Sequence, residues 1–327
     1  MTSFRLPSGP GATRRALLLA AAGAAASTGP AEAQTMPVTV GRDGWLFAQW
    51  DSVDVRMADV QRTLPVISQA ISIIKGAGIG VAILLVPSKT RLYRQYLPPN
   101  LRVSAELDRR YGVAMAEFRK AGAIVPDLDT VFRERARNVQ LWFKSDTHWT
   151  PMAAEIAAVE MAKAVGPTIP PSSRPGTQVT PLITRQHARG DLVRFLPDNQ
   201  RSSYGMESYQ VRDIVNAGGQ NALIADDSAD VALVGNSYVE PRYAFQPILS
   251  NQLMRPVSLF WKPNNVGPYS GLVQFLSSET FKQQRPKVII WTQLELDLET
   301  SPTSGSWGQN GMTVDKFLSE VRRGVAA

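Results

Sequence analysis

Hydrophobic residues along the chain form two patterns, which predict strands alternating with helices. Continuous aliphatic runs occur in GVAILLVPSK, DVALVGNSY and PKVIIWTQ, and such runs are typical of strands covered on both faces of a sheet. AGAIVPDL predicts a further short strand. Helices are predicted at residues 57–77, where Pro65 should kink the helix or mark a later start, and at residues 104–120, 131–138 and 151–164.

Alternating strands and helices are connected by crossovers, which favour parallel pairing. We therefore predict an α/β fold with three α/β/α layers and a mostly parallel sheet. The VGRDGWLF stretch, from Val40 to Phe47, predicts a small opening element with a Gly-Arg-Asp-Gly turn. No shift in composition divides residues 34–327, so they are predicted to form a single domain.

The first 33 residues have the composition of an export signal. A positively charged leader precedes an apolar run, and Ala31 and Ala33 flank Glu32 as in a small-residue cleavage site, which predicts cleavage after Ala33. The run is too short for a stable transmembrane helix. Arg14 and Arg15 also resemble a twin-arginine signal. A retained membrane anchor is the alternative.

Composition excludes several kinds of chemistry. The chain has no cysteine, which excludes thiolate catalysis, cysteine-bound zinc and iron–sulfur clusters. Its two histidines argue against a multi-histidine metal site, and we expect neither a metal nor a cofactor. The net charge is +7. No dense basic run with interleaved aromatic residues is present, so nucleic acid is not the expected partner. The positive charge favours an anionic polymer or membrane surface, or simply keeps the protein soluble.

Ser237 lies where a nucleophile is expected in an α/β sheet. It follows the hydrophobic strand in VALVGNSY, and ligands bind at the carboxyl ends of such strands. A helix is expected to start after it, and nearby backbone N–H groups would then stabilise an oxyanion. A serine that only caps a helix is the alternative.

Asp146 and His148 meet the needs of such a serine. A hydroxyl needs a base to accept its proton, and the base needs an acceptor on its other nitrogen. The LWFKSDTHWT stretch appears extended, and in an extended chain alternate side chains project to the same side. We therefore predict that Asp146 orients His148 and that His148 activates Ser237. A surface turn is the alternative for this pair, whereas His187 has no comparable partner in the sequence.

These motifs together resemble a known family. D-x-H-W, the later G-x-S-Y, VPSK, GRDGWLF and RGDL are similar to the SGNH-hydrolase-like acyltransferases of bacterial exopolysaccharide O-acetylation, which include the periplasmic alginate O-acetyltransferases. The resemblance extends from about Val40 to VIIWTQLELDL. In this family the Asp-His pair precedes the serine, and the order here agrees.

The resemblance implies roles for further residues. Ser237 would carry the acetyl group, His148 would be the base and Asp146 its orienting partner. Tyr243 would line the site near the oxyanion, or else pack within a helix. The remaining candidates for substrate, oxyanion or structural contacts are Asn236, Ser88, Lys89 and Arg91, and solvated surface charge is the alternative for the last two. The chain departs from the family at two positions. Members often have Asp or Thr immediately before the serine, where this chain has Asn236, and they often have Glu after the tryptophan of the C-terminal motif, where this chain has Thr292.

The predicted function is O-acetylation of an exopolysaccharide, alginate-like or cellulose-like, in the periplasm. The resemblance implies that a membrane-bound O-acyltransferase supplies the acetyl group and that the protein belongs to a polysaccharide secretion complex. Two alternatives remain. An acetyl esterase would use the same three residues with water as acceptor, and a scaffold protein would bind polysaccharide without catalysis.

Overall fold

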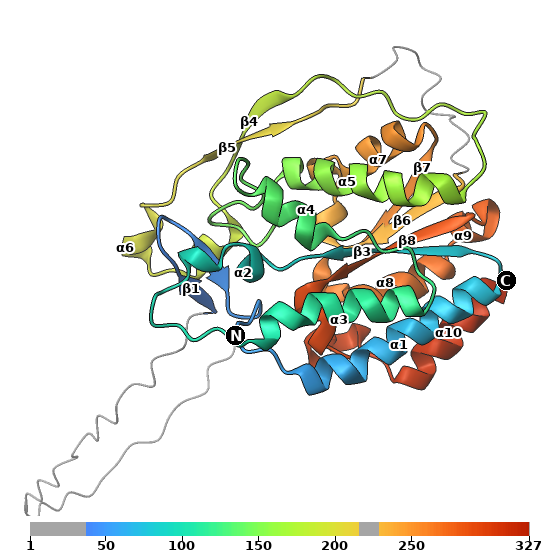
Figure 1. Cartoon of the computed structure of the whole chain (residues 1–327), viewed down its shortest axis with the longest axis horizontal. Helices are drawn as coiled ribbons and strands as arrows, with labels where there is room; N and C mark the ends of the chain where they lie inside the picture. The colour runs from blue at the N-terminus through green and yellow to red at the C-terminus, as the bar shows by residue number, and fades with distance from the viewer. Residues whose placement is uncertain (1–36, 216–228, 327) are drawn as a thin grey trace, which may run out of the picture. The chain divides into compact units, whose positions relative to one another are not determined.

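Four parallel strands form the central sheet, in the order β3-β8-β6-β7 (Figure 1). The computed structural model describes residues 37–215 and 229–326, so the predicted export signal lies outside the described residues. Three of the strands are the predicted aliphatic runs, and their parallel pairing is confirmed. The fourth was not predicted. The strands of this sheet are β3 (Gly80–Val86), β6 (Val231–Gly235), β7 (Val257–Trp261) and β8 (Val288–Leu294).

Helices cover both faces of this sheet, as predicted (Figure 1). One face carries α4 (Leu128–Arg135), α5 (Pro151–Val165) and α7 (Phe245–Leu253). The other carries α1 (Met57–Gly76), α3 (Glu106–Lys120), α8 (Gly267–Leu276) and α10 (Val314–Ala326). The shorter helices are α2 (Lys89–Leu92), α6 (Asp198–Arg201) and α9 (Glu279–Gln284).

The alternation of side chains along each strand divides the interior into two cores. In β3, Ala82 and Leu84 point into the core beneath α5, whereas Val81 and Ile83 point into the core beneath α1 and α3. Because both faces are buried, every position from Val81 to Val86 is hydrophobic.

Two predicted elements differ in detail from the structure. The first helix begins at Met57, so Pro65 lies inside it and does not mark a later start. Its ring is exposed, and water can therefore reach the carbonyl that proline leaves without a donor. The strand predicted in AGAIVPDL is only one parallel bridge between Ile124 and Ala82. Pro126 follows closely and has no N–H with which to extend the ladder.

Two antiparallel pairs flank the sheet. The predicted turn is confirmed: it joins β1 (Val38–Val40) to β2 (Leu46–Ala48), with Asp43 and Gly44 at positive φ. The second pair, β4 (Ile183–His187) and β5 (Glu207–Val211), was not predicted.

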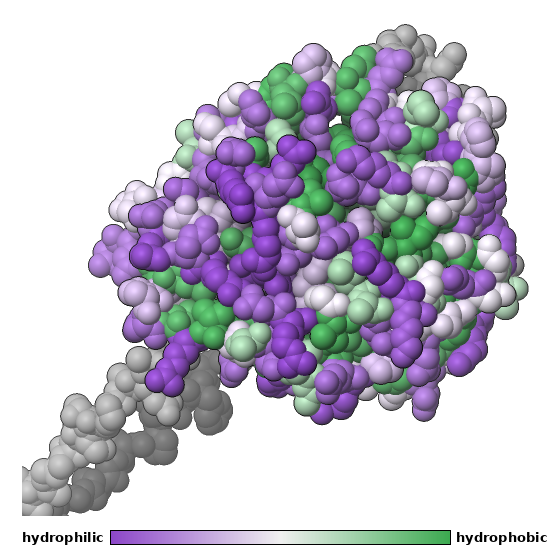
Figure 2. Space-filling model, viewed as in Figure 1, coloured by the Kyte–Doolittle hydropathy of each residue, from purple (hydrophilic) through white to green (hydrophobic). Residues whose placement is uncertain are grey.

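The face of the molecule seen in Figure 2 is mainly polar. Figure 2 shows hydrophilic residues over most of the visible face, with hydrophobic ones scattered between them. None of the helices in the described ranges combines the length and the apolar character needed to cross a membrane.

Candidate active site

Ser237 lies at the carboxyl end of β6, where the sequence places it. Gly235 ends the strand, and a side chain there would collide with Thr292 and Val239, so the close approach to β8 requires glycine. Asn236 accepts a hydrogen bond from the Tyr238 N–H at 3.1 Å and caps the 3₁₀ turn Ser237–Val239. This single turn replaces the expected helix, since α7 begins only at Phe245.

Asp146 and His148 lie in a tight bend, so the prediction of an extended segment was wrong. A bridge between Trp142 and Trp149 closes the loop, and residues 144–148 form a turn and bend within it. Asp146 Oδ1 accepts the His148 backbone N–H at 2.9 Å and lies 2.7 Å from His148 Nδ1. The bend, rather than strand alternation, therefore brings the carboxylate to the imidazole.

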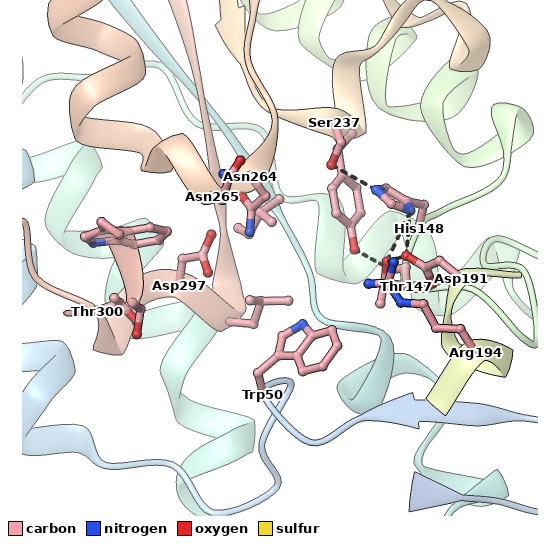
Figure 3. Close-up of a pocket in the computed structure, with 15 residues that line it drawn as sticks. Trp50, Thr147, His148, Asp191, Arg194, Ser237, Asn264, Asn265, Asp297 and Thr300 are labelled. Atoms are coloured by element: carbon pink, nitrogen blue, oxygen red, sulfur yellow. Dashed lines mark hydrogen bonds and ion pairs between the residues drawn. The ribbon is translucent and has the colours of Figure 1, made fainter. Parts of the chain in front are cut away.

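The other imidazole nitrogen reaches the serine. His148 Nε2 lies 2.9 Å from Ser237 Oγ (Figure 3). Two further hydrogen bonds connect the loops that carry these side chains. Trp149 Nε1 donates to the Tyr238 carbonyl at 2.8 Å, and the Tyr238 hydroxyl donates to the Thr147 carbonyl at 2.6 Å. The structure thus brings Ser237, His148 and Asp146 into one hydrogen-bonded chain.

His187 shares Asp146 with His148, contrary to the expectation that it had no comparable partner. Its Nε2 lies 3.0 Å from Asp146 Oδ2, which also accepts the Asp191 backbone N–H at 3.1 Å. Burial would raise the pKa of Asp146, but hydrogen bonds from both histidines hold that pKa well below its usual range. Asp146 is therefore a carboxylate at neutral pH, so both imidazoles donate to it.

The RGDL motif packs against the loop that carries Asp146. A Cβ on Gly190 would lie 2.2 Å from Ser145 backbone atoms, so only glycine permits the approach that brings Asp191 to Asp146. Asp191 also accepts from the Thr147 N–H at 2.8 Å. Glu207, on β5, accepts from the Ser145 N–H at 3.1 Å. The sequence signalled Gly190 and Asp191 only as part of RGDL, through the family resemblance, and it gave no signal for Glu207.

Tyr243 packs against the imidazole ring of His148. Its ring stacks on His148 with centroids 5.7 Å apart, and its buried hydroxyl has no hydrogen-bonding partner among the described residues. Burial raises the pKa of Tyr243 far above its usual value, so the phenol stays protonated. The structure places it beside the imidazole rather than on the wall of the cleft.

Lys89 and Arg91 are buried, so the alternative of solvated surface charge is wrong for both, and neither lines the cleft. Lys89 Nζ donates to the carbonyls of Leu46, Lys144 and Asp146 at 2.7 to 2.8 Å. Burial lowers the pKa of Lys89 to about 7, against the effect of nearby carboxylates. The ammonium group therefore connects the opening hairpin to the Asp146 loop.

Arg91 and Ser88 also have structural partners within the chain. Arg91 forms a buried ion pair with Glu295 at 2.5 Å, and Glu295 accepts the Ser88 N–H at 2.8 Å. The Ser88 hydroxyl caps α2 by accepting the Arg91 N–H. Asn236 is similarly occupied, because its amide donates to Asn264 at 3.0 Å as well as capping the serine turn. The structure thus gives all four predicted contact residues (Ser88, Lys89, Arg91 and Asn236) hydrogen-bonding or ionic partners within the protein.

A cleft of about 460 Å³ opens beside Ser237 and His148 (Figure 3). Its wall near the serine includes Thr147, Asp191 and Arg194. The opposite wall was not predicted, because its residues come from separate loops; it includes Asn264, Asn265, Leu294, Leu296, Asp297, Thr300, Ser306 and Trp307. Ser237 therefore faces a space large enough for part of a sugar chain.

Among the described residues, Asp146, His148 and Asp191 have potential metal-ligand atoms within 4.8 Å of one another. In this geometry, however, both Asp146 oxygens accept hydrogen bonds from histidines, and His148 Nδ1 donates one of them. The same atoms cannot keep these protons and bind a cation. The arrangement fits an orienting network for His148.

The sheet, the serine after β6 and its contact with an Asp-bound imidazole define an SGNH-hydrolase-like protein. The profile of the family described as SGNH hydrolase-like domain, acetyltransferase AlgX, matches residues 38–295. The chain belongs to this family of acetyltransferases.

Similar proteins agree in fold and sequence. The probable alginate O-acetylase AlgJ of Pseudomonas syringae is 31% identical over 299 residues, which cover 88% of this chain and 76% of the relative. The O-acetyltransferase domain of Pseudomonas putida AlgJ matches with a TM-score of 0.69 and 25% identity, covering 87% of this chain and 98% of that domain. AlgX of Pseudomonas aeruginosa matches in fold with a TM-score of 0.61 and 22% identity, and the match covers 82% of this chain and 68% of the AlgX chain.

Proposed function

We propose that this protein transfers acetyl groups to hydroxyls of an exopolysaccharide through an acetyl-Ser237 intermediate. The single observation that carries the proposal is the 2.9 Å contact between Ser237 Oγ and His148 Nε2 at the edge of the cleft. The likeness to alginate O-acetylases supports an alginate-like acceptor, and a cellulose-like polymer is the second candidate.

In the first half-reaction, Ser237 Oγ attacks the carbonyl carbon of the acetyl donor. His148 Nε2 accepts the hydroxyl proton as the new bond forms, and Asp146 stabilises the resulting imidazolium. The tetrahedral intermediate then collapses, and the donor's leaving group departs with the proton from His148. Acetyl-Ser237 remains.

In the second half-reaction, a sugar hydroxyl attacks acetyl-Ser237. His148 takes the proton of that hydroxyl and returns it to Ser237 Oγ as the ester bond to serine breaks. The acetylated sugar leaves and the enzyme returns to its starting state. Water in place of the sugar would give free acetate.

The proposal extends to location and partners. We infer that residues 1–33 direct export to the periplasm and are removed, leaving residues 34–327 as one catalytic domain. A membrane-bound O-acyltransferase would then present the acetyl group, and a polysaccharide secretion complex would deliver the polymer. The positive net charge of the chain suits a polyanionic acceptor.

The test uses an acetyl ester with and without an oligosaccharide of the polymer. Wild type should form acetyl-Ser237, detected by intact-protein mass spectrometry, and should release acetylated oligosaccharide. Ser237→Ala should do neither. Free acetate as the only product, even at high acceptor concentration, would indicate an esterase. Polymer acetylation by Ser237→Ala at the wild-type rate would overturn the proposal in favour of a scaffold.

A further inference from the structure

The cleft extends well beyond the groups that the acetyl transfer uses. Ser237 and His148 lie on one wall, and Asp297 lies on the opposite wall with Asn264 and Asn265 nearby (Figure 3). The groups that the proposed reaction assigns to forming and breaking the serine ester, Ser237 and His148 with Asp146 behind them, belong to the first wall. The second wall is therefore available to hold the acceptor.

The fold brings Asp297 to the cleft because β8 is the direct neighbour of β6. The serine follows the end of β6, and Asp297 lies on the 3₁₀ segment Glu295–Glu299, which follows the end of β8. Parallel strands end at the same edge of a sheet, about 4.8 Å from their neighbours. The loop after β7 adds Asn264 at this edge.

Asp297 forms no ion pair within the described part of the chain, whereas Glu295, the fully buried carboxyl group at the start of the same segment, pairs with Arg91 and Arg110. Its side chain lines the cleft although the residue is only 8% exposed, and its Oδ2 has no hydrogen-bonding partner among the described residues. Burial raises the pKa of Asp297 to about 7, while a hydrogen bond from Asn264 and the charge of Arg110 oppose this. The carboxyl group can thus carry a proton near neutral pH.

A protonated carboxyl group both donates and accepts, as a sugar hydroxyl does. It also adds no negative charge beside an anionic polymer. Trp50, which is 47% exposed, lines the same cleft. Its ring packs edge-to-face against Phe195, with the ring centroids 6.0 Å apart. Aromatic faces bind the C–H faces of sugar rings, while polar groups bind their hydroxyl edges.

We propose that Asp297 binds a hydroxyl of the acceptor sugar and, with Trp50, holds the polymer chain opposite Ser237. This proposal rests on the proposed function, because it names the residues that bind its acceptor. It assigns the second wall of the cleft to the sugar and the first wall to the acetyl group.

A direct binding measurement tests this assignment without requiring turnover. Oligomannuronate is titrated calorimetrically into Ser237→Ala and into the double variants that add Asp297→Ala or Asp297→Asn. Asp297→Ala should weaken binding about tenfold or more, the effect of losing one hydrogen bond in an enclosed site. Asp297→Asn keeps a donor and an acceptor and should bind within about threefold of the parent.

A second measurement separates acceptor binding from chemistry. At a fixed oligomannuronate concentration, acetyl-Ser237 partitions between acetylated sugar and free acetate. Asp297→Ala should shift this ratio toward acetate about tenfold, because water does not need the sugar site. Asp198→Ala is the matched control, since that side chain is 92% exposed and does not line the cleft.

Equal oligomannuronate binding with and without Asp297 would overturn the proposal, and so would an absence of binding to Ser237→Ala. Thermal unfolding of each variant shows whether a loss comes from misfolding, and the Asn variant keeps the test valid if the Ala variant is unstable. A wild type that binds the sugar through Asp297 yet releases only acetate would refute the transferase while leaving this assignment in place.

Discussion

His187 Nε2 lies 3.0 Å from Asp146 Oδ2, so the two histidines of the chain hold the two oxygens of one carboxylate. His187 is itself fixed by stacking on Phe143, with centroids 3.9 Å apart. A carboxylate held on one side only is able to rotate about its Cβ–Cγ bond. With both oxygens bonded, Asp146 presents Oδ1 to His148 in one orientation.

His187→Phe should therefore lower kcat for acetyl-Ser237 formation about ten- to hundredfold, the effect of losing one charge-assisted hydrogen bond that orients the base. His187→Gln keeps an N–H donor and should recover part of the loss. Stopped-flow measurement with a chromogenic acetyl ester checks both variants. A kcat for His187→Phe equal to that of wild type would show that His148 and the Asp191 backbone N–H orient Asp146 without His187.

Gly190→Ala should damage the same network through the backbone. The new Cβ would lie 2.2 Å from Ser145 backbone atoms, which forces the Asp191 segment away from Asp146. We expect the free energy of unfolding to fall by about 2 kcal/mol or more, as for other forced backbone shifts, and ester cleavage to slow with it. Chemical denaturation and steady-state kinetics measure the two effects.

Gly112→Ala is the matched control for this change. Gly112 lies in α3 with nothing within 4 Å of its Cβ position, so alanine there should stabilise the protein by about 0.5 to 1 kcal/mol. If the two variants changed the free energy of unfolding equally, close packing against Ser145 would not be the reason that RGDL has glycine at position 190.

Sequence patterns predicted the parts of the structure that local forces determine. The aliphatic runs of β3, β6 and β8 show burial on both faces, and the helix predicted at residues 151–164 is α5, where Thr150 and Pro151 act within the first helical turn. β7 was missed because VSLFW is short and only Val257 is fully buried. The sequence pattern that predicts a strand is therefore clearest where the strand is completely buried.

The site was predictable only where its residues are close together in the sequence or follow a strand. Asp146, His148 and Ser237 meet one of these conditions. Asp297 also follows a strand, β8, but no residue close to it in the sequence marks it as functional, and Trp50 meets neither condition; both line the cleft only because of the fold. The burial of Lys89 could not be foreseen either, because its three carbonyl partners lie 43 to 57 residues away.

Lys89→Met tests whether that buried ammonium group supports the fold. Three carbonyls would lose their donor, and each buried unpaired group costs about 1 to 3 kcal/mol, although water or relaxation recovers part of this. We expect a loss of roughly 2 to 5 kcal/mol in the free energy of unfolding. Lys163→Met, at a side chain that is 66% exposed, should change it by less than about 0.5 kcal/mol. Similar small effects for both would mean that the Leu46, Lys144 and Asp146 carbonyls find other donors.

Asp297 should also make stability depend on pH. Its pKa is about 7 in the folded protein, above the ordinary value of 3.8, because burial disfavours the charged form; Arg110 opposes this and Asp51 adds to it. Below about pH 4 the carboxyl group is protonated in both the folded and the unfolded chain. Between about pH 4 and 7 only the folded chain retains the proton, so stability falls as pH rises and then levels off.

The asparagine of Asp297→Asn cannot titrate, so this variant should lack the pH dependence of stability that Asp297 contributes. The difference in unfolding free energy between Asp297→Asn and wild type should therefore grow from pH 4 to pH 7, by at most about 1.4 kcal/mol for each pH unit, and stay constant above pH 7. Urea denaturation at pH 4, 5.5, 7 and 8 measures it, and taking the difference removes the groups that titrate alike in both proteins. A difference that does not vary with pH would show that Asp297 is ionised throughout, and that its carboxyl group accepts hydrogen bonds in the cleft without donating one.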